Sequence, residues 1–231
     1  MAIYAVQGLY AAGCLYMTYD LCRNGLNPFF TNPEGVTTGK IKEFVDSQAR
    51  KMDLGKEIVV IPDLNKESRL YYSSYGNTWL PGKVAIKVGY GVTENSEVRF
   101  SEFQTTHYIA HLKANDWLIL PLATLAASLF TTYVLTVNRD LFTRYLGGLV
   151  IGLMTSAVLL RRAERRADQE AMEQCSIEVN KAHLDMRENQ KKKGCRQNPL
   201  KWIFNPSLDE RIEHLKTYLQ SQKEVSEKNL L

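Results

Sequence analysis

The sequence predicts an α+β protein, mainly helical, with a small antiparallel sheet and with a transmembrane helical hairpin inserted into the water-facing part. Two uncharged runs, residues 117–137 and 145–160, predict the hairpin. Residues 57–91 predict the sheet, because β-branched and aromatic residues alternate there with turn residues. A hydrophobic content of 45% is enough for a folded core, and a net charge of +4 is too small to indicate nucleic-acid binding.

The N-terminal segment, residues 1–35, contains a stretch from Ile3 to Leu21 whose only charged residue is Asp20. This stretch fits either a weak third transmembrane segment or an anchor in the membrane interface, with its tyrosines at the headgroups. The segment lacks the basic region and the cleavage site of a signal peptide, so we expect internal targeting.

Residues 36–116 are expected to form the first part of the water-facing domain. Apolar residues at helical spacing predict a helix that is capped by Thr37 or Thr38 and ended by Gly55. Strands are predicted at 57–62, 68–75 and 83–91, and a second helix is predicted from about Ser101 through His111, leading almost directly into the membrane.

The hairpin is predicted over residues 117–160. A helix of 21 residues from Trp117 to Val137 reaches roughly 30 Å, the thickness of the hydrocarbon core. The 16 residues from Tyr145 to Leu160 span a bilayer only if Leu141 and Phe142 also enter the lipid. A buried pair of core helices in a soluble protein is the alternative. A hairpin returns the chain to the side it left, which places His111 and Glu164 at the same membrane face.

Residues 161–231 are expected to form the second part of the domain. A long polar helix over 161–190, a solvated lysine loop over 191–193 and an amphipathic helix from about Ser207 to Gln222 are predicted. Basic residues are more frequent near the membrane on the domain side than in the hairpin linker, so the domain should face the cytoplasm or the mitochondrial matrix. The four cysteines are far apart and are expected to be reduced thiols.

Three side chains form the candidate metal site. His107 and His111 are four residues apart, so on a helix they share one face and two imidazoles there suit one zinc ion. A histidine pair at this spacing is also a common surface coincidence. Glu164, brought back by the hairpin, would complete a site of two histidines and one glutamate with an open fourth position. The alternative for Glu164 is an exposed carboxylate paired with neighbouring arginines.

Three short motifs and one strand resemble those of a known family. The motifs are His107-Tyr108-Ile109-Ala110-His111 with Asp116, Glu164-Arg165-Arg166-Ala167-Asp168, and Asn205-Pro206-Ser207-Leu208-Asp209-Glu210-Arg211-Ile212. The strand is LPGKVAIKVGYG at residues 80–91. From about Val36 to Lys216 the chain resembles the membrane-bound zinc metallopeptidases, which include bacterial HtpX, the CAAX prenyl protease and the stress-activated peptidase of the inner mitochondrial membrane.

The resemblance implies a zincin-like metallopeptidase domain with zinc as the candidate cofactor. The zinc ligands would be His107, His111 and Glu164. Asp168 would not bind the ion but would orient one of these ligands. The strand at residues 80–91 would be the edge strand that holds an extended substrate.

Two departures from the family pattern affect catalysis. Tyr108 stands where the family has the glutamate that acts as general base, and Asn205 replaces a histidine. Loss of a general base typically costs 10²–10⁴-fold in rate, and a phenol with a pKa of about 10 is a poor substitute. We therefore predict an inactive pseudopeptidase that serves as a scaffold, assembly or quality-control subunit of a membrane complex.

Two other functions remain open at this point: an active zinc-dependent membrane endopeptidase, and a metal-free structural subunit of a mitochondrial membrane complex. Membrane lipid and a protein partner or complex are the expected partners, and nucleic acid is not. The expected location is the mitochondrial inner membrane with the main domain on the matrix side, by analogy with the family. A bacterial inner membrane is the alternative.

Overall fold

The computed structural model describes residues 2–20, 22, 39–63, 72–75, 78, 84–89, 99–134, 140–193 and 205–228. Its elements, in chain order, are α1 (Ala2–Asp20), α3 (Lys40–Lys51), β1 (Ile58–Asp63), β2 (Tyr72–Tyr75), β3 (Val84–Gly89), α5 (Arg99–Lys113), α6 (Asp116–Val134), α7 (Leu141–Gln174), α8 (Ile177–Lys192) and α10 (Leu208–Lys228).

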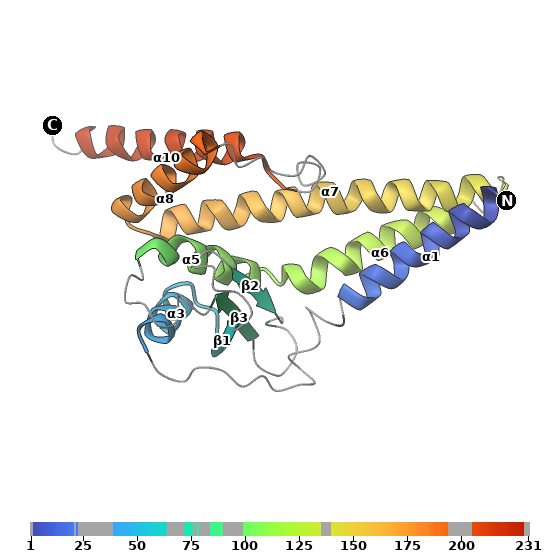
Figure 1. Cartoon of the computed structure of the whole chain (residues 1–231), viewed down its shortest axis with the longest axis horizontal. Coiled ribbons are helices and arrows are strands. Elements are labelled where there is room, and N and C mark those ends of the chain that lie inside the picture. Colours follow the sequence, from blue (N-terminus) through green and yellow to red (C-terminus); the bar gives the residue numbers. More distant parts are fainter. Residues whose placement is uncertain are drawn as a thin grey trace.

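Helix α7 runs along most of the molecule and joins its two parts (Figure 1). Helices α1 and α6 lie beside the first half of α7 and form an arm, which is how we refer to these three segments below. The second half of α7 has α5, α3 and the sheet on one side and α8 with α10 on the other (Figure 1). Within the described residues, α6 and α7 are the two helices that are long and apolar enough to cross a membrane.

The sheet is mixed, which corrects the predicted antiparallel arrangement. The strand order is β1-β3-β2, with β1 parallel to β3 and β2 antiparallel to β3. The strand expected at the edge, β3, therefore lies in the centre, and both of its sides are occupied by neighbouring strands. The central position agrees with its composition, because Val84, Ala85, Ile86 and Val88 are all buried.

The main core lies between α3, the sheet and α5. Val45, Ile58, Ile86 and Ile109 are fully buried there and belong to one contiguous cluster. The helix predicted from Thr37 or Thr38 begins instead after Gly39, whose φ of 112° suits glycine and which offers no side-chain cap. Its apolar face was predicted correctly, since Ile41, Val45, Ala49 and Met52 all face the core, as helical spacing requires.

Helix α7 differs from the prediction in its length. The expected boundary at residue 160 falls inside one continuous helix of 34 residues, and the polar helix expected over 161–190 is split between α7 and α8. The interruption between α7 and α8 lies at Ser176, whose hydroxyl accepts a hydrogen bond from Val179 N and caps α8. Glu164 is therefore carried by the same helix that forms the second predicted span.

Close packing of small residues holds the arm together. Gly148 and Gly152 of α7 face Ser128 of α6, and Ser128 Oγ donates a hydrogen bond to Gly148 O at 2.8 Å. Tyr10 of α1 packs against Gly148, and its ring is tilted by 59° against that of Tyr145, with centroids 5.3 Å apart. Small residues spaced by four allow helix backbones in a membrane to approach closely, so this arrangement is typical of a membrane bundle.

Candidate metal centre

Helix α5 supplies two buried histidines to the candidate site. His107 and His111 lie one turn apart, as the spacing predicts, with 4% and 3% of their surface exposed. Their Nε2 atoms are 3.1 Å apart, and the two rings meet edge to face. Both imidazoles therefore point at the same spot on α7.

Helix α7 supplies the carboxylate. Glu164 Oε2 lies 3.5 Å from His107 Nε2, and Glu164 Oε1 lies 3.5 Å from His111 Nε2. The structure thus brings the three predicted residues together. His111 and Glu164 are far apart in the sequence, and the hairpin of α6 and α7 brings them side by side. The alternative of an exposed Glu164 does not hold, because its side chain is only 21% exposed.

The geometry of the three residues fits a zinc ion. Bonds of about 2.0–2.1 Å at tetrahedral angles place two ligand atoms about 3.3–3.4 Å apart. The distances above, 3.1 Å between the nitrogens and 3.5 Å from each nitrogen to a carboxylate oxygen, lie close to that spacing. Two neutral imidazoles and one carboxylate are also a donor set that zinc accepts with an open fourth position.

Each histidine has a carboxylate behind its ring. Asp116, the first residue of α6, places Oδ2 at 2.6 Å from His111 Nδ1. Asp168 places Oδ1 at 2.9 Å from His107 Nδ1, out of line with the N–H bond, so this contact is mainly electrostatic. Carboxylates in these positions fix the ring orientation and leave Nε2 for a metal. Asp168 thus lies where the sequence placed it.

Two arginines neutralise these carboxylates. Arg211 of α10 donates to Glu164 Oε2 through Nη2, and its Nη1 lies 3.3 Å from Asp168 Oδ1. Arg166 of α7 donates to the same Asp116 oxygen that contacts His111. These ion pairs are partly buried, so they are screened less than surface pairs, and they join both α6 and α10 to α7.

The protonation of His111 follows from its neighbours. Burial alone favours the neutral ring, but the hydrogen bond to Asp116 and the nearby Glu164 carboxylate outweigh burial and raise the pKa of His111 to about 9. At neutral pH a doubly protonated His111 donates to Asp116 from Nδ1 and to His107 from Nε2. In the absence of a metal the charges of the site are therefore balanced by this proton and by the two arginines.

Tyr108 lies beside both ligand histidines. Its ring centroid is 5.3 Å from that of His107 and 6.1 Å from that of His111, and the ring packs partly buried against the main core. A phenol rather than a carboxylate therefore occupies the position next to the candidate ligands.

A buried histidine behind the site stays neutral. His183 of α8 stacks on Phe103 with ring centroids 3.8 Å apart, and its Nε2 accepts a hydrogen bond from Arg187 Nε at 3.2 Å. Burial and the adjacent Arg187 hold the pKa of His183 well below its usual value. Burial and the neighbouring Arg211 likewise lower the pKa of Arg187, to about 10.

Acidification is therefore expected to destabilise the fold through His183. Below about pH 6.5, His183 is protonated in the unfolded chain but stays neutral in the folded chain. The free energy of unfolding therefore falls by at most about 1.4 kcal/mol per pH unit. Above that pH the residue has no effect. In His183→Gln the amide still accepts from Arg187 but does not titrate, so its thermal midpoint in detergent should fall less on acidification. Equal pH dependence of the two proteins would contradict this assignment.

Sequence reasoning missed two of the residues that contact the site. Arg211 was known only as part of a motif, yet it contacts both Glu164 and Asp168. Asp116 was noted after the histidines without a role, and it is the hydrogen-bond partner of His111. Asn115 has a positive φ of 58°, and the turn that it makes between α5 and α6 brings Asp116 to His111.

The fold has a known counterpart. The structure resembles the crystal structure of S. mikatae Ste24p, with a TM-score of 0.53 and 19% sequence identity, over 92% of this chain and 57% of that one. This chain thus spans little more than half the length of that protein. No protein-family model matches the chain, and no curated protein matches it.

Together, the comparison and the two apolar helices describe a Ste24p-like fold with two helices that are long and apolar enough to cross a membrane. At this level of similarity the comparison concerns the fold alone. The metal, the activity and the zincin-like character of the domain remain predictions.

Proposed function

We propose that this chain is an integral membrane pseudopeptidase that binds zinc through His107, His111 and Glu164 and no longer hydrolyses peptides. The observation that carries the proposal is the near-tetrahedral spacing of the three ligand atoms beside a tyrosine in the general-base position. Such a protein would act as a scaffold, assembly or quality-control subunit of a membrane complex.

Each contact residue has a defined part in holding the ion. Asp116 and Asp168 hold the imidazoles so that both Nε2 atoms face Glu164, and Arg211 and Arg166 keep these carboxylates ionised inside the protein. Bound zinc would supply Lewis acidity and lower the pKa of a bound water to about 7.

Hydrolysis needs one more group than the site contains. A positioned base must accept the proton of the attacking water and pass it to the leaving amine. A tyrosine phenol, which has an unperturbed pKa of about 10, is a poor base at neutral pH. The protein is therefore expected to keep the metal site and the adjoining surface while lacking the proton transfer.

Metal analysis tests the proposal directly. Detergent-purified protein is expected to contain about one zinc per chain, and His107→Ala is expected to contain almost none, because removing one of three ligands leaves a weak site. His214→Ala is the matched control, since it removes a histidine of α10 that is not a candidate ligand. A wild-type protein without zinc, or equal zinc in His107→Ala and wild type, would refute the metal assignment.

A metal-free structural subunit of a mitochondrial membrane complex is a second candidate, favoured by one observation. Arg211 already donates to Glu164, and a protonated His111 balances the remaining charge, so the site is neutral without an ion. In that case zinc would not raise the thermal midpoint of the purified chain, whereas a bound ion stabilises the folded state.

The proposed location is the mitochondrial inner membrane, with the domain on the matrix side. Arg161, Arg162, Arg165 and Arg166 follow the apolar part of α7 at the end of the arm that joins the domain, whereas Arg144 lies near its other end. This asymmetry agrees with the positive-inside tendency. A bacterial inner membrane with the domain in the cytoplasm would produce the same asymmetry.

A further inference from the structure

A cavity lies beneath α1 where it crosses α6 and α7. Its volume is about 480 Å³, and its walls include Gly13 and Met17 of α1, Leu120 and Pro121 of α6, and Leu153 and Leu160 of α7. We call it the α1 cavity. At its domain end it reaches Asp116 and Trp117, at the point where the arm meets the metal centre.

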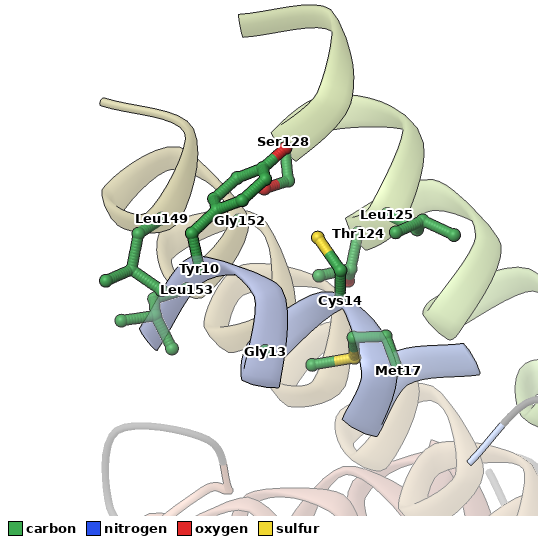
Figure 2. Close-up of a pocket in the computed structure, with 10 residues that line it drawn as sticks. All are labelled: Tyr10, Gly13, Cys14, Met17, Thr124, Leu125, Ser128, Leu149, Gly152 and Leu153. Atoms are coloured by element: carbon green, nitrogen blue, oxygen red, sulfur yellow. The ribbon is translucent and has the colours of Figure 1, made fainter. Parts of the chain in front are cut away.

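The α1 cavity continues along α1 into a smaller hollow. Gly13, Met17, Thr124 and Leu153 line both spaces, and the smaller one, about 40 Å³, extends the path toward Tyr10. Figure 2 shows Tyr10, Cys14 and Met17 of α1 facing Thr124 and Ser128 of α6 across this hollow. The buried Tyr10 hydroxyl has no hydrogen-bond partner among the described residues. The two spaces together form an elongated path rather than a rounded chamber.

The surroundings indicate which kind of molecule fills this path. Large apolar side chains cover the outer faces of the arm, among them Phe130, Val150 and Met154, which are 68%, 44% and 59% exposed. An arm with such a surface lies in lipid, so the cavity borders hydrocarbon chains rather than water. Protein interiors contain few voids larger than a water molecule. The lining of this one is mostly apolar, with Thr124, Ser156 and Asp116 as polar residues, so a space of this size suits a hydrocarbon chain.

Charge at the domain end favours a lipid with a phosphate. The cavity wall ends at Leu160, and the exposed Arg162 follows two residues later, whereas Arg161 is paired with Glu210 of α10. Arginine binds phosphate groups well, and basic residues just beyond a membrane helix attract lipid headgroups. A chain lying under α1 would therefore have its headgroup at the level of Arg162.

We propose that the α1 cavity binds one acyl chain of a membrane phospholipid, which completes the packing between α1 and the hairpin. None of the three candidate metal ligands lines the cavity, and its contact with the metal centre is through Asp116 at the domain end. The phospholipid is a structural component of the arm rather than a transient neighbour.

Lipid retention in the purified full-length chain tests this proposal. The protein is reconstituted in vesicles of palmitoyl-oleoyl phosphatidylglycerol, extracted in dodecyl maltoside and washed, and bound lipid is counted by native mass spectrometry. Wild type is expected to retain one phospholipid per chain. Gly13→Leu is expected to retain at least about tenfold less, because the new side chain would enter the cavity; a Cβ at Gly13 meets only Leu149, at 3.8 Å.

Gly8→Leu is the matched control, since a Cβ at this position of the same helix meets nothing within 4 Å. It should retain lipid as wild type does. Thr124→Leu fills the same path from α6 and is also expected to lose the lipid. It serves as the test variant if Gly13→Leu does not fold. Retention by a folded cavity-filling variant equal to wild type, or only detergent adducts on wild type, would overturn the proposal.

Discussion

Tyr108→Glu is expected to give this chain measurable peptidase activity. The substitution places a carboxylate beside the two candidate ligand histidines, where the proposed pseudopeptidase lacks a base to accept the proton of the attacking water. A glutamate has an unperturbed pKa of about 4.3 and is ionised at neutral pH, whereas tyrosine is protonated. Restoring a positioned base typically changes a rate by 10²–10⁴-fold, so cleavage of labelled casein should rise at least about a hundredfold.

Two controls separate this effect from a change in folding. Tyr108→Gln has nearly the shape of the glutamate variant without its charge, and it should stay as inactive as wild type. Adding His111→Ala to Tyr108→Glu should abolish the new activity together with the zinc. A zinc-loaded Tyr108→Glu protein without cleavage would show that position 108 is not the cause of inactivity. Cleavage by wild type itself, lost in His107→Ala, would favour the active endopeptidase.

Gly148→Leu is expected to disrupt the arm. Even a Cβ at this position would overlap Thr132 Oγ1, lie 2.9 Å from Tyr10 Cε2 and lie 3.0 Å from Ser128 O. The helices α6 and α7 must then separate, and the hydrogen bond from Ser128 to Gly148 is lost. Overpacking typically costs 1–3 kcal/mol and a hydrogen bond between membrane helices adds about 0.6, so a loss of roughly 2–4 kcal/mol is expected.

Thermal unfolding in detergent micelles measures this loss. Gly8→Leu adds the same side chain to a helix of the arm at an open position, so its midpoint should stay close to that of wild type. Because α7 also carries Glu164, the Gly148→Leu protein is expected to lose zinc as well. A midpoint for Gly148→Leu equal to that of Gly8→Leu would contradict the close crossing of α6 and α7.

The hairpin and the three candidate ligands were predictable because each depends on a local pattern. Uncharged length identifies α6 and the first half of α7, and a spacing of four residues puts His107 and His111 on one helix face. The return of Glu164 to the same face then follows from the topology of a hairpin. No side-chain detail was needed for this step.

The order of the strands was not predictable from the same kind of pattern. Strand pairing depends on contacts between distant segments, and β-propensity is the same for parallel and antiparallel neighbours. The continuous apolar run from Val84 to Ile86 was the available signal, because it suits a strand covered on both faces. The role of Arg211 was equally hidden, since its partners lie more than 40 residues earlier in the chain.

The continuity of α7 has a mechanical consequence. About 24 Å of uninterrupted helix separate the Gly148 crossing from Glu164, at 1.5 Å per residue. A lean of only about 5° at that crossing would displace the Glu164 end by about 2 Å, roughly ten times the tolerance of a zinc–ligand distance. Helices adjust their lean to the thickness of the host bilayer. In a chain that spans a bilayer, the thickness of the membrane would therefore affect the position of Glu164 relative to the two histidines. The ion pair between Arg166 of α7 and Asp116 of α6 would oppose this movement.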